Sequence, residues 1–452
     1  MKKALKYLKE NREKYISDLI ELLSYPSISA KGIGIKECSK ILSEMLKNVG
    51  FKVEIYSNKN SYPVIYGELI TGAEKTIIFY NHYDVQPVEP LEEWENDPFK
   101  PVIKDGKIIA RGVADNKGNI MSRLKAIESY LKAYDDLPVN IKWVIEGEEE
   151  IGSINLSEFI KEYRERLMGE GIIWESGGRD SKGYPKLSFG CKGIIYIELV
   201  SKKGKKDLHS AYASIVENPT WHIISALNVL KDVKEDKILV PGFYDDILEP
   251  SPEEWELLEK YPIEEEELKE SLGVSKFINN LSGKNLYKKL LYSPTCNICG
   301  IYSGYIGEGS KTVLPKYAKV KIDFRLVPNQ KAEVLFENIK NYLKEKGFDD
   351  LEVIPYGLED PVQTPINNPL KEVIEKSAEK IFGVKPKLSP RMSGTGPMAL
   401  FYNELKIPIV EGVGCGHPAS QVHAPNENCF LEDYFKTIEW VIGIIDEYRG
   451  VS

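Results

Sequence analysis

The sequence predicts an α/β fold, in which a mixed, largely parallel sheet is flanked by helices and a smaller α+β domain is inserted. Short β-rich runs alternate with helical periods up to residue 190, an alternation typical of a parallel sheet. Beyond residue 190 the strands have one solvated face, and after residue 363 the α/β character returns. We therefore expect a main domain of residues 1–190 and 364–452 and an inserted domain of residues 191–363.

The first part of the chain contains the elements expected to build the main sheet. Apolar residues at helical spacing over 4–24 predict one amphipathic helix. Two further helices are expected at 35–49 and 119–134. Short runs bounded by turns predict strands at 52–55, 64–67, 76–80, 107–110, 140–145 and 171–174.

The second part of the chain predicts a βαβ-type set with one solvated face. Its expected strands are 194–200, 317–325 and 351–354, and its expected helices are 218–233 and 331–346. The acidic, proline-punctuated stretch 249–272 predicts a solvated helical excursion. A last helix–strand–loop–helix run, 369–452, belongs to the main domain.

Composition narrows the class of protein. A chain of 452 residues with 42% hydrophobic and 29% charged residues indicates a globular protein large enough to be an enzyme. The net charge of -9 argues against a nucleic-acid partner. No apolar run is long enough to span a bilayer, and residues 1–6 lead into an amphipathic helix, so we expect a cytoplasmic protein with no membrane partner.

The six cysteines do not suggest a disulfide framework in a chain of this length. Cys296 and Cys299 form a CxxC pair, but no second pair completes a structural zinc site. We interpret them as two thiols in a strand, with metal binding as the alternative.

An apolar strand ends in a run of carboxylates at Glu146, Glu148, Glu149 and Glu150. Neighbouring carboxylates repel one another and raise each other's pKa unless a cation offsets their charge. Arginines or metal ions are the two candidate sources of that charge. A metal ion beside a spare carboxylate would be able to activate water.

Histidine is scarce, so the positions of the five histidines are informative. Most candidate metal ligands lie just past the end of a predicted strand, where open α/β sheets build their sites. The candidates are His82 and Asp84 after 76–80, Asp115 after 107–110, Glu149 and Glu150 after 140–145, Glu175 after 171–174, and His423 in a late loop.

Two histidines and three carboxylates make a ligand set suited to zinc, cobalt or manganese. If one carboxylate bridges, this set can hold two ions. The alternative is that each acid is a helix cap or surface charge and each histidine a core residue. Five such loops in one chain argue against that alternative.

The chain resembles a known family in nine short motifs, which follow one another in the same order as in that family. They span residues 82–87, 94–99, 105–106, 111–118, 146–153, 207–210, 311–315, 325–329 and 423–427. Over nearly its whole length the chain resembles the dinuclear-zinc metallopeptidases that include carnosine dipeptidases, glutamate carboxypeptidases, aminoacylases and succinyl-diaminopimelate desuccinylases. The resemblance implies a metal-dependent hydrolase of a peptide bond, in dipeptides or at the C-terminus of short peptides, acting on peptide or N-acyl amino acid substrates.

The resemblance also implies roles for the site residues. Asp115 would bridge two divalent ions, with zinc expected first and cobalt or manganese as alternatives. His82 and Glu175 would bind one ion, and Glu150 and His423 the other. Asp84 would orient His82, and Glu149 would be the general base that moves a proton from the bridging water to the leaving amine. A cis peptide bond is implied at Asp115–Asn116.

The inserted domain resembles a ferredoxin-like lid that forms a homodimer in the family. His209 matches the histidine that one subunit lends to its partner's active site to stabilise the oxyanion. Thr312, Arg325, Arg391 and Thr395 match positions that contact the substrate, although Arg325 also fits an ordinary exposed strand position. His222 and His417 match no ligand and are interpreted as structural.

Two positions depart from the carnosine dipeptidase branch, which the chain otherwise resembles most. Those enzymes usually have Asp at Glu175, and an acidic residue that helps to hold the substrate's free amine at Met392. Because Met cannot pair with an ammonium group, we expect an enzyme that binds the C-terminal carboxylate and tolerates a blocked or extended amine side. The alternatives are an N-acyl amino acid deacylase or desuccinylase, and a non-catalytic binding homologue, against which the intact ligand set argues.

Overall fold

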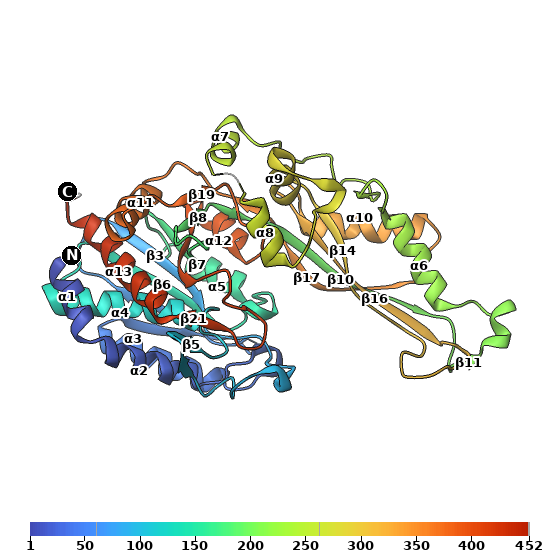
Figure 1. Ribbon diagram of the computed structural model, residues 1–452, viewed down its shortest axis with the longest axis horizontal. Coiled ribbons are helices and arrows are strands. Elements are labelled where there is room, and N and C mark those ends of the chain that lie inside the picture. Colours follow the sequence, from blue (N-terminus) through green and yellow to red (C-terminus); the bar gives the residue numbers. More distant parts are fainter. Residues whose placement is uncertain (60, 262, 451–452) are drawn as a thin grey trace.

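The computed structural model describes residues 1–59, 61–261 and 263–450, which form two lobes (Figure 1). The larger lobe contains the N-terminal helices and the C-terminal helix, and the smaller lobe extends away from it. Among the described residues, no helix combines the length and apolar character needed to cross a membrane.

The larger lobe is built on an eight-stranded sheet with the order β1-β2-β6-β3-β7-β20-β8-β19. The pairs β6–β3, β3–β7, β7–β20 and β19–β8 are parallel, and the other three are antiparallel, which confirms the predicted mixed, largely parallel sheet. The strands are β1 (Lys52–Tyr56), β2 (Val64–Leu69), β3 (Thr76–His82), β6 (Asn140–Glu146), β7 (Gly171–Gly178), β8 (Lys186–Ser188), β19 (Lys387–Ser389) and β20 (Ile409–Gly416).

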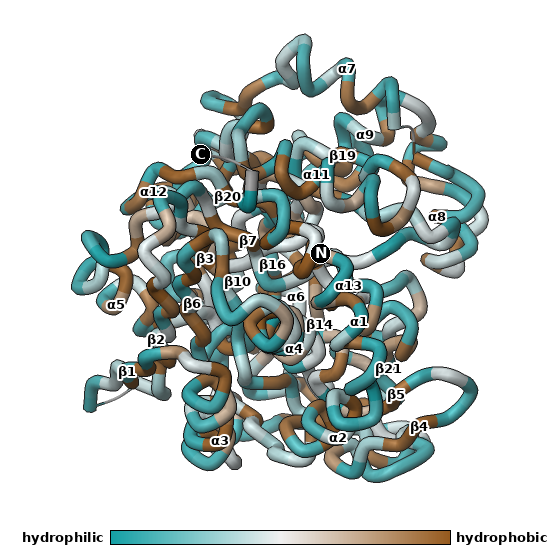
Figure 2. The backbone as a smooth tube through the Cα atoms, turned by 90° about the vertical axis from the view of Figure 1, so that its left-hand side faces the viewer, coloured by the Kyte–Doolittle hydropathy of each residue, from teal (hydrophilic) through white to brown (hydrophobic). Residues whose placement is uncertain are grey.

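Helices cover both faces of this sheet, so its central strands are apolar on both sides. Ile77 and Phe79 of β3 belong to the core on one face, and Ile78 and Tyr80 to the core on the other. Figure 2 shows the hydrophobic stretches of β3, β6 and β7 passing through the middle of this lobe. The first face is covered by α1 (Lys2–Glu10), α2 (Arg12–Leu23), α3 (Ile35–Val49), α4 (Lys117–Tyr134), α11 (Pro369–Phe382) and α13 (Leu431–Glu447), and the second by α5 (Leu156–Glu162) and α12 (Met398–Leu405).

The single helix predicted for residues 4–24 is two helices, α1 and α2, and the prediction was wrong at Asn11. Asn11 leaves the helical region, with φ -115° and ψ 15°. Its side-chain Nδ2 donates a hydrogen bond to the carbonyl of Tyr7 at 2.8 Å. Such local bonding competes with the helical backbone, and hydrophobic spacing alone does not reveal it.

The smaller lobe has the element order β10, α6, β14, β16, α10, β17, which is the predicted ferredoxin-like order. Its sheet has the order β14-β16-β10-β17, and all its pairs are antiparallel. Both helices pack on this sheet around a core of its own. The bounds are β10 (Gly193–Lys202), α6 (Pro219–Leu230), β14 (Thr295–Ser303), β16 (Tyr317–Leu326), α10 (Ala332–Glu345) and β17 (Glu352–Glu359).

Three details of this lobe bear on the predictions. The helix predicted for 218–233 ends at Leu230, because the next residues pair as β12 (Lys231–Asp232) with β13 (Lys237–Ile238). Cys296 and Cys299 lie on β14, and all six cysteines are free thiols. The acidic excursion contains α7 (Pro252–Lys260) and α8 (Glu265–Leu272), followed by α9 (Gly283–Tyr292).

The chain crosses between the lobes twice, and the two crossings lie side by side. β9 (Gly190–Cys191) pairs antiparallel with β18 (Val362–Gln363). The boundaries expected at 190–191 and 363–364 fall on these crossings. The inserted domain as a separate lid and dimerisation unit remains a prediction.

Candidate active site

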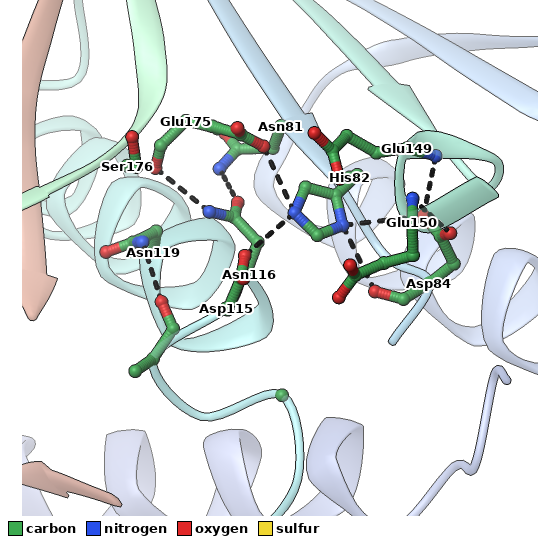
Figure 3. Close-up of polar contacts among 12 residues, drawn as sticks. Asn81, His82, Asp84, Asp115, Asn116, Asn119, Glu149, Glu150, Glu175 and Ser176 are labelled. Atoms are coloured by element: carbon green, nitrogen blue, oxygen red, sulfur yellow. Dashed lines mark hydrogen bonds and ion pairs between the residues drawn. The ribbon is translucent and has the colours of Figure 1, made fainter. Parts of the chain in front are cut away.

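The predicted ligands His82, Asp115, Glu150 and Glu175 lie together with Asp84 and Glu149 at the carboxyl-terminal edge of the large sheet (Figure 3). His82 is the last residue of β3, and Glu175 lies on the neighbouring strand β7. Glu149 and Glu150 begin a short 3-10 turn after β6. Parallel strands bring residues that are far apart in sequence to one edge.

Asp115 lies between two histidines. Its Oδ1 is 3.0 Å from Nε2 of His82, and its Oδ2 is 3.0 Å from Nε2 of His423. The loop that carries it precedes α4, and its Asp115–Asn116 peptide bond is cis. Each oxygen of one carboxylate therefore faces a different imidazole.

Each histidine also faces a second carboxylate. Oε2 of Glu175 is 3.1 Å from Nε2 of His82, and Oε2 of Glu150 is 3.2 Å from Nε2 of His423. The site thus contains two groups of three donors that share Asp115. All five predicted ligands are brought together, and their division between two ions remains a prediction.

The donor atoms fit a pair of divalent ions. Neighbouring ligand atoms on a tetrahedral ion with bonds near 2.0–2.1 Å are about 3.3 Å apart, close to the separations found here. Among the residues that the structure describes, the potential ligand atoms of His82, Asp115 and Glu150 lie within 4.8 Å of one another, so Glu150 is also near the ion assigned to His82. Oε2 of Glu175 is buried, and its one neighbouring donor is Nε2 of His82, which also faces Asp115, so a cation between these atoms would satisfy both carboxylates.

The electrostatics of the site show the same need for positive charge. Burial opposes the charged form of His82, yet the charge of Glu175 and the bond to Asp115 hold its pKa well above the ordinary value. Hydrogen bonds to Asp115 and Glu150 raise the pKa of His423 to about 10. Without ions, protons on the histidines offset the carboxylates, and ions would displace those protons.

Asp84 is fully buried and contacts both the ligands and the predicted base. Its Oδ1 lies 3.4 Å from Nδ1 of His82, and its backbone carbonyl lies 3.1 Å from the same nitrogen. Its two oxygens accept hydrogen bonds from the backbone N–H groups of Glu149, at 3.2 Å, and Glu150, at 3.1 Å. Figure 3 shows these contacts around His82.

The carboxylate of Glu149 extends beside this cluster. Burial raises its pKa well above the ordinary value, and the charge of Glu175 adds to the effect. Within the described residues, no hydrogen bond or ion pair holds its side chain. The neighbouring Glu148 has a different role, because its carboxylate accepts hydrogen bonds from the backbone of Tyr62 and Asn155.

Sequence reasoning missed two residues that position the ligands. Glu427 accepts hydrogen bonds from the backbone N–H groups of Gly112, Ala114 and Asp115, all within 3.0 Å. Gln86 donates to Oε2 of Glu150 at 2.8 Å. Both lie inside motifs that the sequence had indicated, but a carboxylate or amide in a loop has no pattern that distinguishes it from a surface residue.

The predicted substrate contacts fall into two groups. The first lies next to the site, where Nη1 of Arg325 donates to Oγ1 of Thr395 at 2.6 Å. Arg391 is buried there, with its guanidinium engaged by Glu254 at 3.0 Å and by Gln363 at 2.9 Å. Glu254 belongs to the excursion predicted to be solvated, so that prediction was wrong for this residue.

The second group, His209 and Thr312, lies elsewhere. Oγ1 of Thr312 is 3.5 Å from Nε2 of His209, and both residues are exposed. His209 ends β11 (Leu208–His209), which lies at the end of the smaller lobe that is remote from β3, β6 and β7 (Figure 1). In one copy of the chain these two residues are therefore apart from the metal ligands.

The two remaining histidines have structural partners. Nδ1 of His222 is 2.9 Å from the hydroxyl of Ser201, and Nε2 of His417 is 3.1 Å from Oδ1 of Asn428.

Comparison with known proteins identifies the family. The sequence pattern of peptidase family M20/M25/M40 matches residues 78–447. The chain belongs to this family. Its members are metal-dependent peptide hydrolases, so the predicted resemblance and the hydrolytic peptidase class are confirmed.

Three similar proteins illustrate the relationship. The M20 family metallo-carboxypeptidase Sso-CP2 from Sulfolobus solfataricus is 42% identical, over 96% of this chain and 99% of that one, with a TM-score of 0.92. Human carnosine dipeptidase 1 is 25% identical, over 99% of both chains, with a TM-score of 0.86. Beta-Ala-His dipeptidase of Rattus norvegicus is 26% identical, over 96% of this chain and 93% of that protein.

Proposed function

We propose that this protein is a dinuclear metallopeptidase that cleaves dipeptides or removes the C-terminal residue of short peptides. The observation that carries the proposal is Asp115, whose two oxygens face His82 and His423. Glu149 lies beside them with no side-chain partner among the residues that the structure describes. The likeness to a metallo-carboxypeptidase and to dipeptidases supports this substrate class.

Two divalent ions would be held by the five ligands, with zinc the first candidate and cobalt or manganese also suited to the donors. When bound, the ions would supply positive charge that polarises the scissile carbonyl and lowers the pKa of a water molecule. His82, Asp115 and Glu175 would bind one ion, and His423, Asp115 and Glu150 the other. Gln86 would keep Glu150 oriented toward its ion.

Glu149 is the proposed general base. No partner within the described residues restrains its carboxylate, so it can accept a proton from water and deliver it to the leaving amine. A raised pKa suits a group that has to take up a proton and then release it. Asp84 positions the base through the backbone N–H of Glu149 and orients His82 as a ligand.

Arg325 and Thr395 are proposed to bind the C-terminal carboxylate of the substrate. The nearest carboxylate to Arg325 is Asp323, at 3.7 Å, so its guanidinium retains capacity for an anion. The backbone of the loop around Arg391 would complete this contact, because the Arg391 side chain itself is engaged.

A homodimer through the smaller lobe is part of the proposal. His209 and Thr312 would enter the active site of a second copy, because in their own chain they lie at the remote end of the lobe. Trp221 and Ile224 of α6 and Ile298 and Ile301 of β14 are exposed, and β14 is an edge strand, features suited to an interface. Six free thiols fit the proposed cytoplasmic location.

One experiment tests metal and substrate together. The metal-depleted protein would be reconstituted with zinc, cobalt or manganese and assayed on dipeptides, longer peptides and N-acyl amino acids. We expect no turnover without metal and C-terminal cleavage of peptides, including N-acylated ones, after reconstitution. Cleavage confined to free-amine dipeptides, with every N-acylated peptide left intact, would contradict the tolerance inferred from Met392.

A second candidate, an N-acyl amino acid deacylase, is favoured by the same Met392, because an apolar side chain does not select an ammonium group. Turnover confined to N-acyl amino acids, with every peptide left intact, would establish that candidate instead.

A further inference from the structure

Arg325 and Glu359 occupy one row across the sheet of the smaller lobe. In β10, Ile194 pairs with Arg325 of β16 on one side and with Glu359 of β17 on the other. Registered residues on neighbouring strands point to the same face of a sheet. A cation and an anion therefore emerge on one face, about 10 Å apart at the backbone, which is two strand spacings.

The Glu359 carboxylate has no partner among residues 1–59, 61–261 and 263–450. No hydrogen bond or ion pair reaches its oxygens there, and the residue is half-buried with oxygens that remain accessible to solvent. Burial raises the pKa of Glu359, and the charge of Arg325 partly counteracts this rise. A partly desolvated carboxylate without a protein partner would gain from a bound cation.

Glu359 lines a cavity of about 630 Å³ that begins next to the base. Gly396 lines the same cavity, and a Cβ placed on it would lie 3.8 Å from Oε1 of Glu149. Gly396 also follows Thr395, the partner of Arg325. A substrate held at Arg325 and cleaved beside Glu149 would thus extend its acyl side into this cavity.

The charge of the cavity is negative. Its charged lining residues are Lys331, Glu333, Glu359 and Asp360, one base against three acids. Lys331 is already paired with Asp360 at 2.7 Å. Glu359 thus faces the interior of the cavity as a carboxylate that Lys331 does not neutralise.

We propose that Glu359 selects substrates that carry a positive charge, an ammonium or guanidinium group, on the acyl side of the scissile bond. The inference rests on the proposed function, since it assumes that Arg325 holds the C-terminal carboxylate. An extended dipeptide is about 7 Å long, so both of its charged ends fit between Arg325 and Glu359. In an N-acylated peptide the charge would come from a lysine or arginine side chain.

The test compares four substrates on the metal-loaded enzyme: Leu-Ala, N-acetyl-Leu-Ala, N-acetyl-Lys-Ala and N-acetyl-Glu-Ala. For the wild type we expect a higher kcat/KM for the lysine substrate than for N-acetyl-Leu-Ala. Glu359→Gln should reduce that ratio by about 10- to 100-fold, the effect of losing one buried charge-assisted contact. Glu359→Lys should reverse the preference, in favour of N-acetyl-Glu-Ala.

The matched control is Glu352→Gln on the same strand, an exposed glutamate paired with Lys202, which should keep the wild-type ratio. Loss of the free-dipeptide rate in Glu359→Gln would identify the ammonium terminus as the recognised group, and loss of the lysine rate would identify the side chain. Unchanged ratios in both Glu359 variants would overturn the inference alone. Failure of the wild type to cleave any of the substrates would overturn the proposed function and the inference together.

Discussion

Asp84 has no direct contact with the bridging position, yet it touches both a ligand and the turn that carries the base. Its two oxygens are occupied by the backbone N–H groups of Glu149 and Glu150, and one of them also approaches His82. An asparagine at this position would have one oxygen and one N–H₂ group, so one backbone N–H would lose its acceptor.

We expect Asp84→Asn to lower kcat by about 10- to 100-fold and to weaken metal binding, with a smaller change in KM. Steady-state kinetics and metal analysis of the purified variant check this. A purely structural role would lower the melting temperature and leave the kcat of the folded, metal-loaded fraction at the wild-type value.

Glu149→Gln separates the base from the ligands. The variant should retain two ions, because Glu149 is not one of the five ligands, and should lose about 10²- to 10⁴-fold in kcat. Metal content and turnover are measured on the same sample. Undiminished turnover would refute the assignment of the base.

Glu148→Gln is the matched comparison. Its carboxylate holds the backbone of Tyr62 and Asn155, so the change should lower the melting temperature while the folded enzyme keeps its turnover. Opposite effects at these adjacent glutamates would distinguish catalysis from folding.

The metal ligands were predictable from the sequence because each one follows an apolar run that ends at the same sheet edge. Glu427 was not predictable, since its function depends on three backbone N–H groups of a loop more than three hundred residues earlier. Every residue except proline has a backbone N–H, so the residue types do not show which N–H groups a distant carboxylate will bind.

At the level of elements, β7 and β20 approach each other closely just beyond Glu175. A Cβ on Gly177 would lie 2.1 Å from the backbone carbon of Gly412, and Gly177 has a φ of +135°. Both strands therefore require glycine where they approach each other.

Gly177→Ala should reduce the free energy of unfolding by at least about 2 kcal/mol, because backbone atoms cannot yield as a flexible side chain can. Gly183→Ala is the control: its φ is +82°, but nothing lies within 4 Å of the added Cβ. That variant should lose only about 1 kcal/mol from the left-handed conformation. Urea unfolding of both variants measures the difference, and equal losses would contradict the steric explanation.

Element prediction succeeded where hydrophobic periodicity was strong, as in α3, which has the predicted bounds Ile35–Val49. It failed at Asn11, where a side-chain hydrogen bond ends one helix and another begins. The end of α6 at Leu230 was likewise not predictable from helical spacing, because it depends on the pairing of the next residues with a strand further along the chain.

At the scale of the whole molecule, the remote position of His209 predicts that one chain completes the site of another. Coexpressed His209→Ala and Glu149→Gln variants would form mixed dimers in which one of the two sites has an intact base and an intact histidine. We expect each variant alone to be nearly inactive and the mixture to recover about a quarter of wild-type turnover, since half of randomly formed dimers are mixed.

The control mixture pairs Glu149→Gln with Asp84→Asn. Both residues belong to the same lobe, so every site in a mixed dimer has one defect, and no recovery should appear. Recovery in neither mixture, with dimers demonstrated in solution, would exclude the proposed exchange of His209 between subunits.

The sequence predicted an inserted domain from the change in strand pattern near residue 190, and this part of the chain contains a four-stranded sheet of its own, while the exact domain division remains a prediction. The distance in space between His209 and the metal ligands of the same chain was not predictable. Sequence separation does not determine how far a four-stranded sheet extends from the larger lobe.

The paired crossings β9 and β18 have a mechanical consequence for opening and closing. Gly190 and Cys191 pair in register with Gln363 and Val362, so the two crossings form one two-stranded connection. We expect the lobes to move relative to each other mainly by bending of this connection. Glu359 lies three residues before Val362 of this connection, and Arg325 lies in the same row of the smaller lobe's sheet. A bend of the connection would therefore move both charges together relative to the larger lobe, while the spacing between them stays constant.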